Sequence, residues 1–176
     1  MAEKKTYEEM MQLVSDLAIN NYKSGYNCTE CVFLALIDSG ALPIPRETVK
    51  MAIGFGGGIG CSGETCGALS GAIMANGAMH GRLGWETEDP MQRGNDVAGK
   101  YYRRYNAMVR EFAKANGGSV TCKSISEPFG DWNCKERKKY CMKMIGATAQ
   151  MAYKYLQIPN EEAFKMPYGF NMHGLE

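Results

Sequence analysis

Apolar residues recur at helical spacing along most of this chain of 176 residues, and few stretches alternate with period two. Capping signals at Thr6 and Asn27, each followed three residues later by Glu, mark two helix starts. The predicted helices cover about residues 6–22, 27–39, 45–53, 62–81, 90–116 and 134–156. We therefore expect an all-α fold, a single-domain bundle of about five to six helices over residues 1–176.

A glycine-rich loop, residues 54–60, precedes the helix that we expect at the centre of the bundle. In that helix Gly67, Gly71 and Ala75 recur every four residues, which leaves a groove where another helix can approach closely. The surrounding stretch, residues 51–79, contains nine glycines and one charge, Glu64. We interpret it as a buried centre and expect no membrane insertion.

Charge adds little to the picture. The chain has 20 basic and 19 acidic residues mixed along its length, so no basic stripe indicates a nucleic-acid partner. The first residues lack the apolar run of a secretory signal. We therefore expect a cytoplasmic protein, in a compartment that keeps thiols reduced.

Seven cysteines carry the clearest chemical signal: Cys28, Cys31, Cys61, Cys66, Cys122, Cys134 and Cys141. A static disulfide framework is disfavoured in a reducing compartment, so metal binding or redox work is the better interpretation. Cys28 and Cys66 fall in the first turns of predicted helices, where the partial positive charge lowers a thiol pKa. Their thiolates would be suited to bind metal or to attack a disulfide.

Two local pairs leave the type of chemistry open. Cys28 and Cys31 form a C-x-x-C pair, and Cys61 and Cys66 bracket the turn from the glycine loop to the helix. Together they are a weak match to a four-cysteine zinc site. Either pair could also serve thiol–disulfide exchange, although no βαβ pattern surrounds them.

The sequence CGALSG at residues 66–71 resembles the CGAxxG signature of the C-GCAxxG-C-C family of candidate redox-active proteins. The resemblance covers about residues 7–156 and leaves a C-terminal tail at 157–176. It implies a small helical protein with four family cysteines, similar to the non-haem part of split-Soret cytochromes, which carry an iron–sulfur cluster within a dimer. The four family cysteines fall here on Cys28, Cys66, Cys122 and Cys141.

Our leading hypothesis is therefore a metalloprotein that binds an iron–sulfur cluster through these four cysteines, for electron transfer or redox sensing. An unidentified redox partner and a homodimer are expected with it. Three further cysteines depart from the family pattern and are possible additional ligands: Cys31, Cys61 and Cys134.

Two alternatives stay open. One is a thiol–disulfide oxidoreductase, with Cys28 or Cys66 as nucleophile and Cys31 or Cys61 as resolving thiol. The other is a zinc-stabilised module without catalysis. The sequence leaves open whether the protein is an enzyme.

Overall fold

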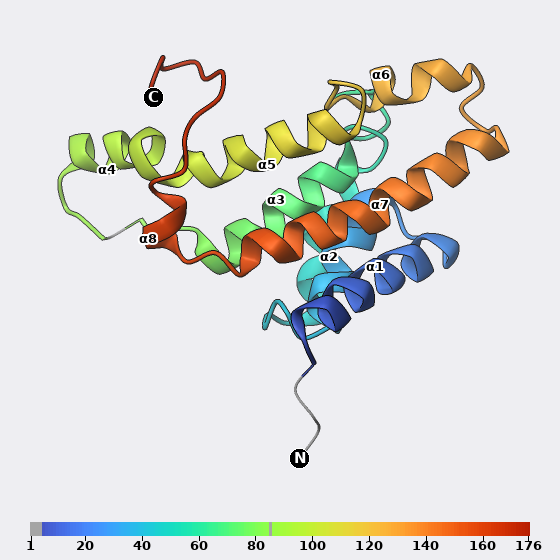
Figure 1. The fold of residues 1–176 in the computed structure, drawn as a ribbon, viewed down its shortest axis with the longest axis horizontal. Helices are drawn as coiled ribbons and strands as arrows, with labels where there is room; N and C mark the ends of the chain where they lie inside the picture. The colour runs from blue at the N-terminus through green and yellow to red at the C-terminus, as the bar shows by residue number, and fades with distance from the viewer. Residues whose placement is uncertain (1–4, 85) are drawn as a thin grey trace.

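The computed structural model describes residues 5–84 and 86–176. The prediction that the first residues form no secretory signal concerns residues 1–4 in part, and these lie outside the described residues. The elements of the structure are α1 (Tyr7–Lys23), α2 (Cys28–Asp38), the 3-10 helix η1 (Arg46–Phe55), α3 (Gly67–His80), α4 (Pro90–Asp96), the π-helical turn η2 (Val97–Tyr101), α5 (Tyr102–Ala115), α6 (Cys122–Ser126), the 3-10 turn η3 (Glu127–Phe129), α7 (Lys135–Leu156) and α8 (Asn160–Ala163). Figure 1 shows their arrangement. The described residues contain no strand, so the all-α prediction is confirmed, with eight α-helices instead of five to six.

Local capping explains why three predicted helices start where expected. Thr6 and Asn27 each form a capping box, with Glu9 and Glu30 respectively, and these boxes begin α1 and α2. The start of α7 lies one residue after the predicted Cys134, which is its N-cap. Such ends depend on residues a few positions apart, which a sequence displays directly.

The short helix expected at residues 45–53 is the 3-10 helix η1, with Pro45 as its N-cap, whereas two other predicted helices need correction. The expected helix over residues 90–116 is α4, η2 and α5 in succession, because the chain passes through a π-helical turn at Val97–Tyr101. The expected helix over 62–81 begins only at Gly67, because the residues before it pair with the segment around Thr121. The short helices α6 and α8 carry too few residues to show a periodicity.

The long helix α7 organises the bundle, since it packs against α1, α2 and α3 (Figure 1). The predicted groove on α3 exists and is occupied by α2. A Cβ atom added at Gly71 would lie 2.6 Å from the backbone oxygen of Thr29, so glycine is required for this approach. Because α3 and α7 run in the same direction, their N-terminal ends lie at the same end of the molecule (Figure 1).

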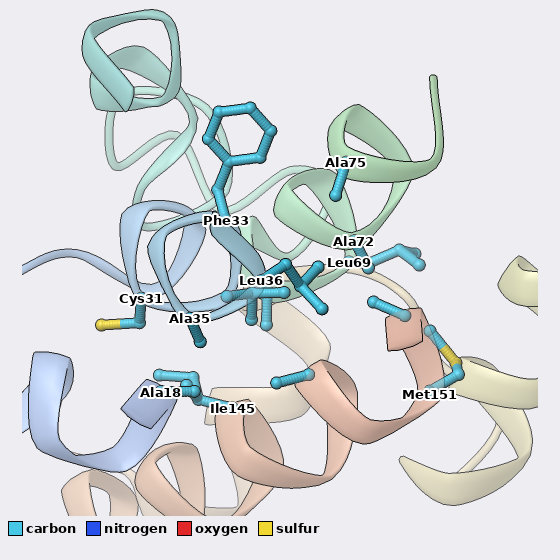
Figure 2. Close-up of a cluster of buried hydrophobic side chains, with 14 of the residues drawn as sticks. Ala18, Cys31, Phe33, Ala35, Leu36, Leu69, Ala72, Ala75, Ile145 and Met151 are labelled. Carbon is cyan, nitrogen blue, oxygen red and sulfur yellow. The ribbon is translucent and has the colours of Figure 1, made fainter. Parts of the chain in front are cut away.

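The core forms where α1, α2, α3 and α7 meet. Figure 2 shows Ala18, Leu36, Leu69 and Ile145, one from each of these helices, directed towards a common centre. The interpretation of residues 51–79 as a buried centre is wrong for the first part, because Met51 is 68% exposed on η1. No helix in the described part of the chain is long and apolar enough to cross a membrane.

The C-terminal tail is packed against the bundle and lies along α5. The backbone oxygen of Phe170 accepts from Asn106 Nδ2 at 2.9 Å, and Gly169 N–H donates to Asn106 Oδ1 at 3.0 Å. Arg103 on α5 reaches the backbone oxygen of Met166 at 2.8 Å. The tail therefore covers the side of the molecule away from α1 (Figure 1).

Candidate functional site

Five cysteine side chains line one cavity of about 360 Å³. They are Cys28, Cys61, Cys66, Cys122 and Cys141. The structure thus brings together the four cysteines singled out from the sequence, although up to 113 positions (141 − 28) separate them along the chain. Cys31 and Cys134 do not line this cavity.

A short antiparallel bridge between Thr65 and Thr121 places Cys66 beside Cys122. Cys66 N–H donates to the backbone oxygen of Val120 at 2.8 Å, and Cys122 N–H donates to that of Glu64 at 2.7 Å. Each cysteine then starts a helix, since Cys66 is the N-cap of α3 and Cys122 is the first residue of α6. The β-branched residues preceding each cysteine were the available signal for this pairing.

Cys28 is positioned by its own helix end and by a glycine. It is the first residue of α2, behind the N-cap Asn27, whose side chain accepts from the amides of Thr29 and Glu30. A Cβ atom added at Gly67 would lie 2.5 Å from Cys28 Sγ. The sulfur therefore lies against the backbone of α3, one residue after Cys66.

The glycine loop is a left-handed turn that carries the fifth thiol. Five consecutive residues have positive φ, from 59° to 74°, and two of them, Ile59 and Cys61, are not glycine. This region is costly for an L-residue with a side chain, above all for a β-branched one. The turn places the exposed Cys61 at the cavity, where its Sγ lies against Gly57. The glycine loop is thus a tight structural turn.

Sequence reasoning missed the charged group at this site, Arg137. Its side chain is 7% exposed, and its Nη1 donates to Cys141 Sγ at 3.7 Å. Its Nε donates to the backbone oxygen of Trp132, and its guanidinium carbon lies 3.8 Å from the centroid of the Trp132 ring. The spacing of four residues between Arg137 and Cys141 on one helix was the signal that could have found this contact.

The two cysteines outside the cavity have structural surroundings. Cys31 is fully buried in the core, directed away from α3 (Figure 2), and its Sγ donates to the backbone oxygen of Tyr26 at 3.4 Å. Cys134 is the N-cap of α7, and its Sγ accepts from Arg137 N–H at 3.4 Å. In this arrangement neither thiol reaches the shared cavity.

Burial raises the pKa of three of the cavity thiols. Burial, together with the charge of a Cys28 thiolate, raises the pKa of Cys66 to about 12. Burial and Cys28 also raise the pKa of Cys122. For Cys141, burial raises the pKa and the Arg137 charge lowers it in part. The expected low pKa of Cys66 is therefore wrong: the Ala68 and Leu69 amides lower it, but by less than burial raises it.

The cavity wall is apolar apart from its sulfur atoms and a few polar groups. Ser126 Oγ is a buried atom of this wall with no hydrogen-bond partner among the described residues. In the same part of the chain, no group of three or more His, Cys, Asp or Glu side chains is close enough to hold a metal ion. The five thiols thus share a cavity without converging on one point.

Comparison with known proteins gives one family and one curated relative. Residues 26–155 match the model of a family described as "Putative redox-active protein (C_GCAxxG_C_C)". The chain belongs to this family. An uncharacterized protein of Archaeoglobus fulgidus is 28% identical to it over 134 residues, which cover 74% of this chain and 85% of the relative. No solved structure matches the chain.

The family match starts just before Cys28 and ends after Cys141, so it contains all seven cysteines. The match leaves out residues 1–25, which include α1, and the packed C-terminal tail. The resemblance inferred from the CGAxxG sequence is therefore confirmed, and the protein is a cysteine-containing member of the family with that description.

Proposed function

We propose that this protein binds an iron–sulfur cluster through Cys28, Cys66, Cys122 and Cys141 and uses it for electron transfer or redox sensing. The observation that carries the proposal is the convergence of these four thiols, from four different helices, on one cavity. Four cysteine thiolates are the ligand set of the common iron–sulfur clusters.

The absence of a tight group of three or more ligands among the described residues bears on the zinc alternative. Four sulfurs bound to one zinc ion at 2.3 Å lie about 3.8 Å apart. The described residues contain no such tight group, although five thiols line the cavity. A cluster spreads its ligands over several irons, so its sulfurs can stand farther apart. This weakens the zinc-stabilised module as an alternative.

The residues around the thiols suit such a group. Ile53, Ile125 and Met144 give the cavity an apolar lining, and such a lining helps to set the potential of a bound cluster. Ser126 Oγ, which lacks a partner among the described residues, could donate to a sulfur. When bound, the cluster would supply a one-electron redox centre. The four thiols would have to lose their protons on binding, as metal ligands do.

The surroundings of the thiols weigh against disulfide exchange through Cys66 or Cys31. The thiolate is the attacking form, and burial raises the pKa of both groups to about 12. Cys31 is also fully buried and does not line the cavity with Cys28. Cys61 is the exposed thiol at the cavity and remains the candidate for exchange with a soluble disulfide.

Anaerobic reconstitution with iron and sulfide tests the proposal. We expect a brown protein with bound iron and sulfide, and the loss of both when Cys66 or Cys141 is replaced by Ser. Cys31→Ala and Cys134→Ser are matched controls, since these thiols lie outside the cavity, and they should keep the cluster. A colourless, iron-free wild-type protein would overturn the proposal.

A further inference from the structure

Arg137 is the one charged residue among the described residues that line the cysteine cavity. It is almost wholly buried, and no ion pair of the described chain includes it. Its Nε and Nη1 have partners in Trp132 and Cys141, whereas Nη2 has no acceptor among the described residues. A buried guanidinium without a carboxylate is costly unless some other negative group neutralises it.

The position of Arg137 in its helix increases that cost. It lies in the first turn of α7, where the unsatisfied amides already give a partial positive charge. The helices α2 and α3 also begin at this cavity, with Cys28 and Cys66 at their first turns. The starts of α2 and α3 and one cation thus face a space lined by no carboxylate among the described residues.

The negative groups that Arg137 can act on are the thiols themselves. Its Nη1 lies 3.7 Å from Cys141 Sγ, and Cys122 lines the same cavity. With the thiols protonated, the cavity has a net positive character. An occupant that carries negative charge would remove this imbalance.

We propose that Arg137 makes this cavity selective for an anionic occupant, the thiolate-ligated cluster, and stabilises its reduced form over its oxidised form. The inference rests on the proposed function, because it takes the cluster as the occupant. With four thiolates, common iron–sulfur clusters carry a net negative charge. Reduction adds one electron from an external donor and neither forms nor breaks a bond. The added charge lies beside the guanidinium, so the cation raises the reduction potential.

The first test measures the reduction potential of the reconstituted protein by a dithionite titration. We expect Arg137→Gln to weaken the preference for the reduced form about tenfold, which corresponds to about 59 mV for one electron. Arg137→Lys keeps the charge and should stay closer to wild type. The control is Lys139→Gln, which removes one positive charge from an exposed position of the same helix.

An equal potential in Arg137→Gln and Lys139→Gln would overturn the inference and leave the proposed function intact. Arg137→Met provides a second neutral variant if Arg137→Gln does not fold, because an apolar side chain removes the buried charge without leaving polar groups unpaired. It should show the same lowered potential.

The second test needs no cluster. Cluster-free protein is alkylated with iodoacetate, which is an anion, and in parallel with neutral iodoacetamide, and Cys141 is followed by peptide mass spectrometry. The ratio of the two rates cancels the ionisation of the thiol and reports the charge around it. We expect the ratio to fall several-fold in Arg137→Gln and to be unchanged in Lys139→Gln and Arg137→Lys.

A ratio that does not change in Arg137→Gln would overturn the selectivity for anions. The two readouts separate the inference from the proposed function. If wild-type protein takes up no iron, the proposed function fails, whereas the alkylation ratio still decides whether Arg137 makes the cavity favour anions.

Discussion

Two buried arginines lie at opposite ends of α7 and have opposite surroundings. At the C-terminal end, Arg104 is 2% exposed and donates to the backbone oxygens of Tyr155 and Ile158 and to Asn160 Oδ1. At the N-terminal end, Arg137 meets one carbonyl oxygen, one sulfur and an aromatic ring. The two side chains are equally buried, but only Arg104 has acceptors that match its donors.

The difference separates a charge with matched acceptors from the charge to which we assign a functional role. The last carbonyls of a helix carry partial negative charge, so Arg104 binds where the helix lacks partners of its own. His80 adds to this end, with its Nε2 at 2.9 Å from the oxygen of Leu156. Arg137 occupies the end where a cation is least favoured. A local conflict of this kind is expected at functional sites, where an occupant compensates for it.

Replacing the two arginines in turn should give the largest contrast in stability. Arg104→Gln leaves buried carbonyl oxygens without donors, so we expect it to lower the free energy of unfolding by about 3 kcal/mol. Arg137→Gln removes a cation without a carboxylate partner, and cluster-free protein should lose less than about 1 kcal/mol. Chemical denaturation of cluster-free protein measures both. Equal losses of unfolding free energy in the two variants would contradict the difference that we infer between the two arginines.

The glycines of α3 provide a second contrast, because α3 packs against α7 and runs in the same direction. A Cβ atom at Gly67 would lie 2.5 Å from Cys28 Sγ and 2.9 Å from the backbone oxygen of Phe55. We expect Gly67→Ala to cost about 2 kcal/mol through overpacking and to lower iron uptake by displacing Cys28.

Gly77→Ala is the matched control near the other end of α3. Its Cβ would lie 3.8 Å from the Tyr105 hydroxyl, which is an ordinary contact. Alanine is the better helix former, so this variant should be neutral or more stable by up to about 1 kcal/mol. Thermal melts and iron assays of both variants check the contrast, and a similar loss in both would contradict it.

Removal of the N-cap of α7, at the end of the helix near the cysteine cavity, should have a smaller effect on stability. Cys134 Sγ accepts from the Arg137 amide, so Cys134→Ala removes the cap and should cost about 1 kcal/mol. Cys134→Ser supplies a better acceptor and should be neutral or stabilising. Denaturation midpoints of the two variants measure this. Loss of the cluster in the serine variant would instead indicate that Cys134 is a ligand.

The smallest expected effect is a pH dependence of stability that comes from His80, which lies at the C-terminal end of α7. Burial lowers the pKa of His80 below its ordinary 6.5. As the pH falls below about 6.5, the unfolded state binds a proton before the folded state does, so stability decreases. His80→Gln removes this titration, and its stability should depend less on pH over the same range. Denaturation of both proteins across this range tests the sign.

The local parts of this structure could be predicted from the sequence. The capping residues Thr6 and Asn27 mark helix starts correctly, because their partners are three residues away. The glycine groove on α3 was visible for the same reason. The four family cysteines could also be named from the sequence. That prediction came from the resemblance to a family and not from a local sequence pattern.

What could not be predicted depends on pairings far apart in the chain. The Thr65–Thr121 bridge joins segments 56 positions apart (121 − 65), and it delays the start of α3. The burial that raises the pKa of Cys66 also arises from tertiary packing, so the expectation based on the helix end alone had the wrong sign. The unpartnered charge of Arg137 became visible only when its surroundings were known.

The dispersal of the cavity cysteines ties the lifetime of the protein to its occupant. Because these thiols meet only in the folded chain, a group that needs all of them binds the native state and not the unfolded one. At 100 times its dissociation constant such an occupant adds about 2.7 kcal/mol to stability. In a cell, proteases remove chains through their unfolded fraction. The abundance of this protein would then rise and fall with the supply of iron and sulfide.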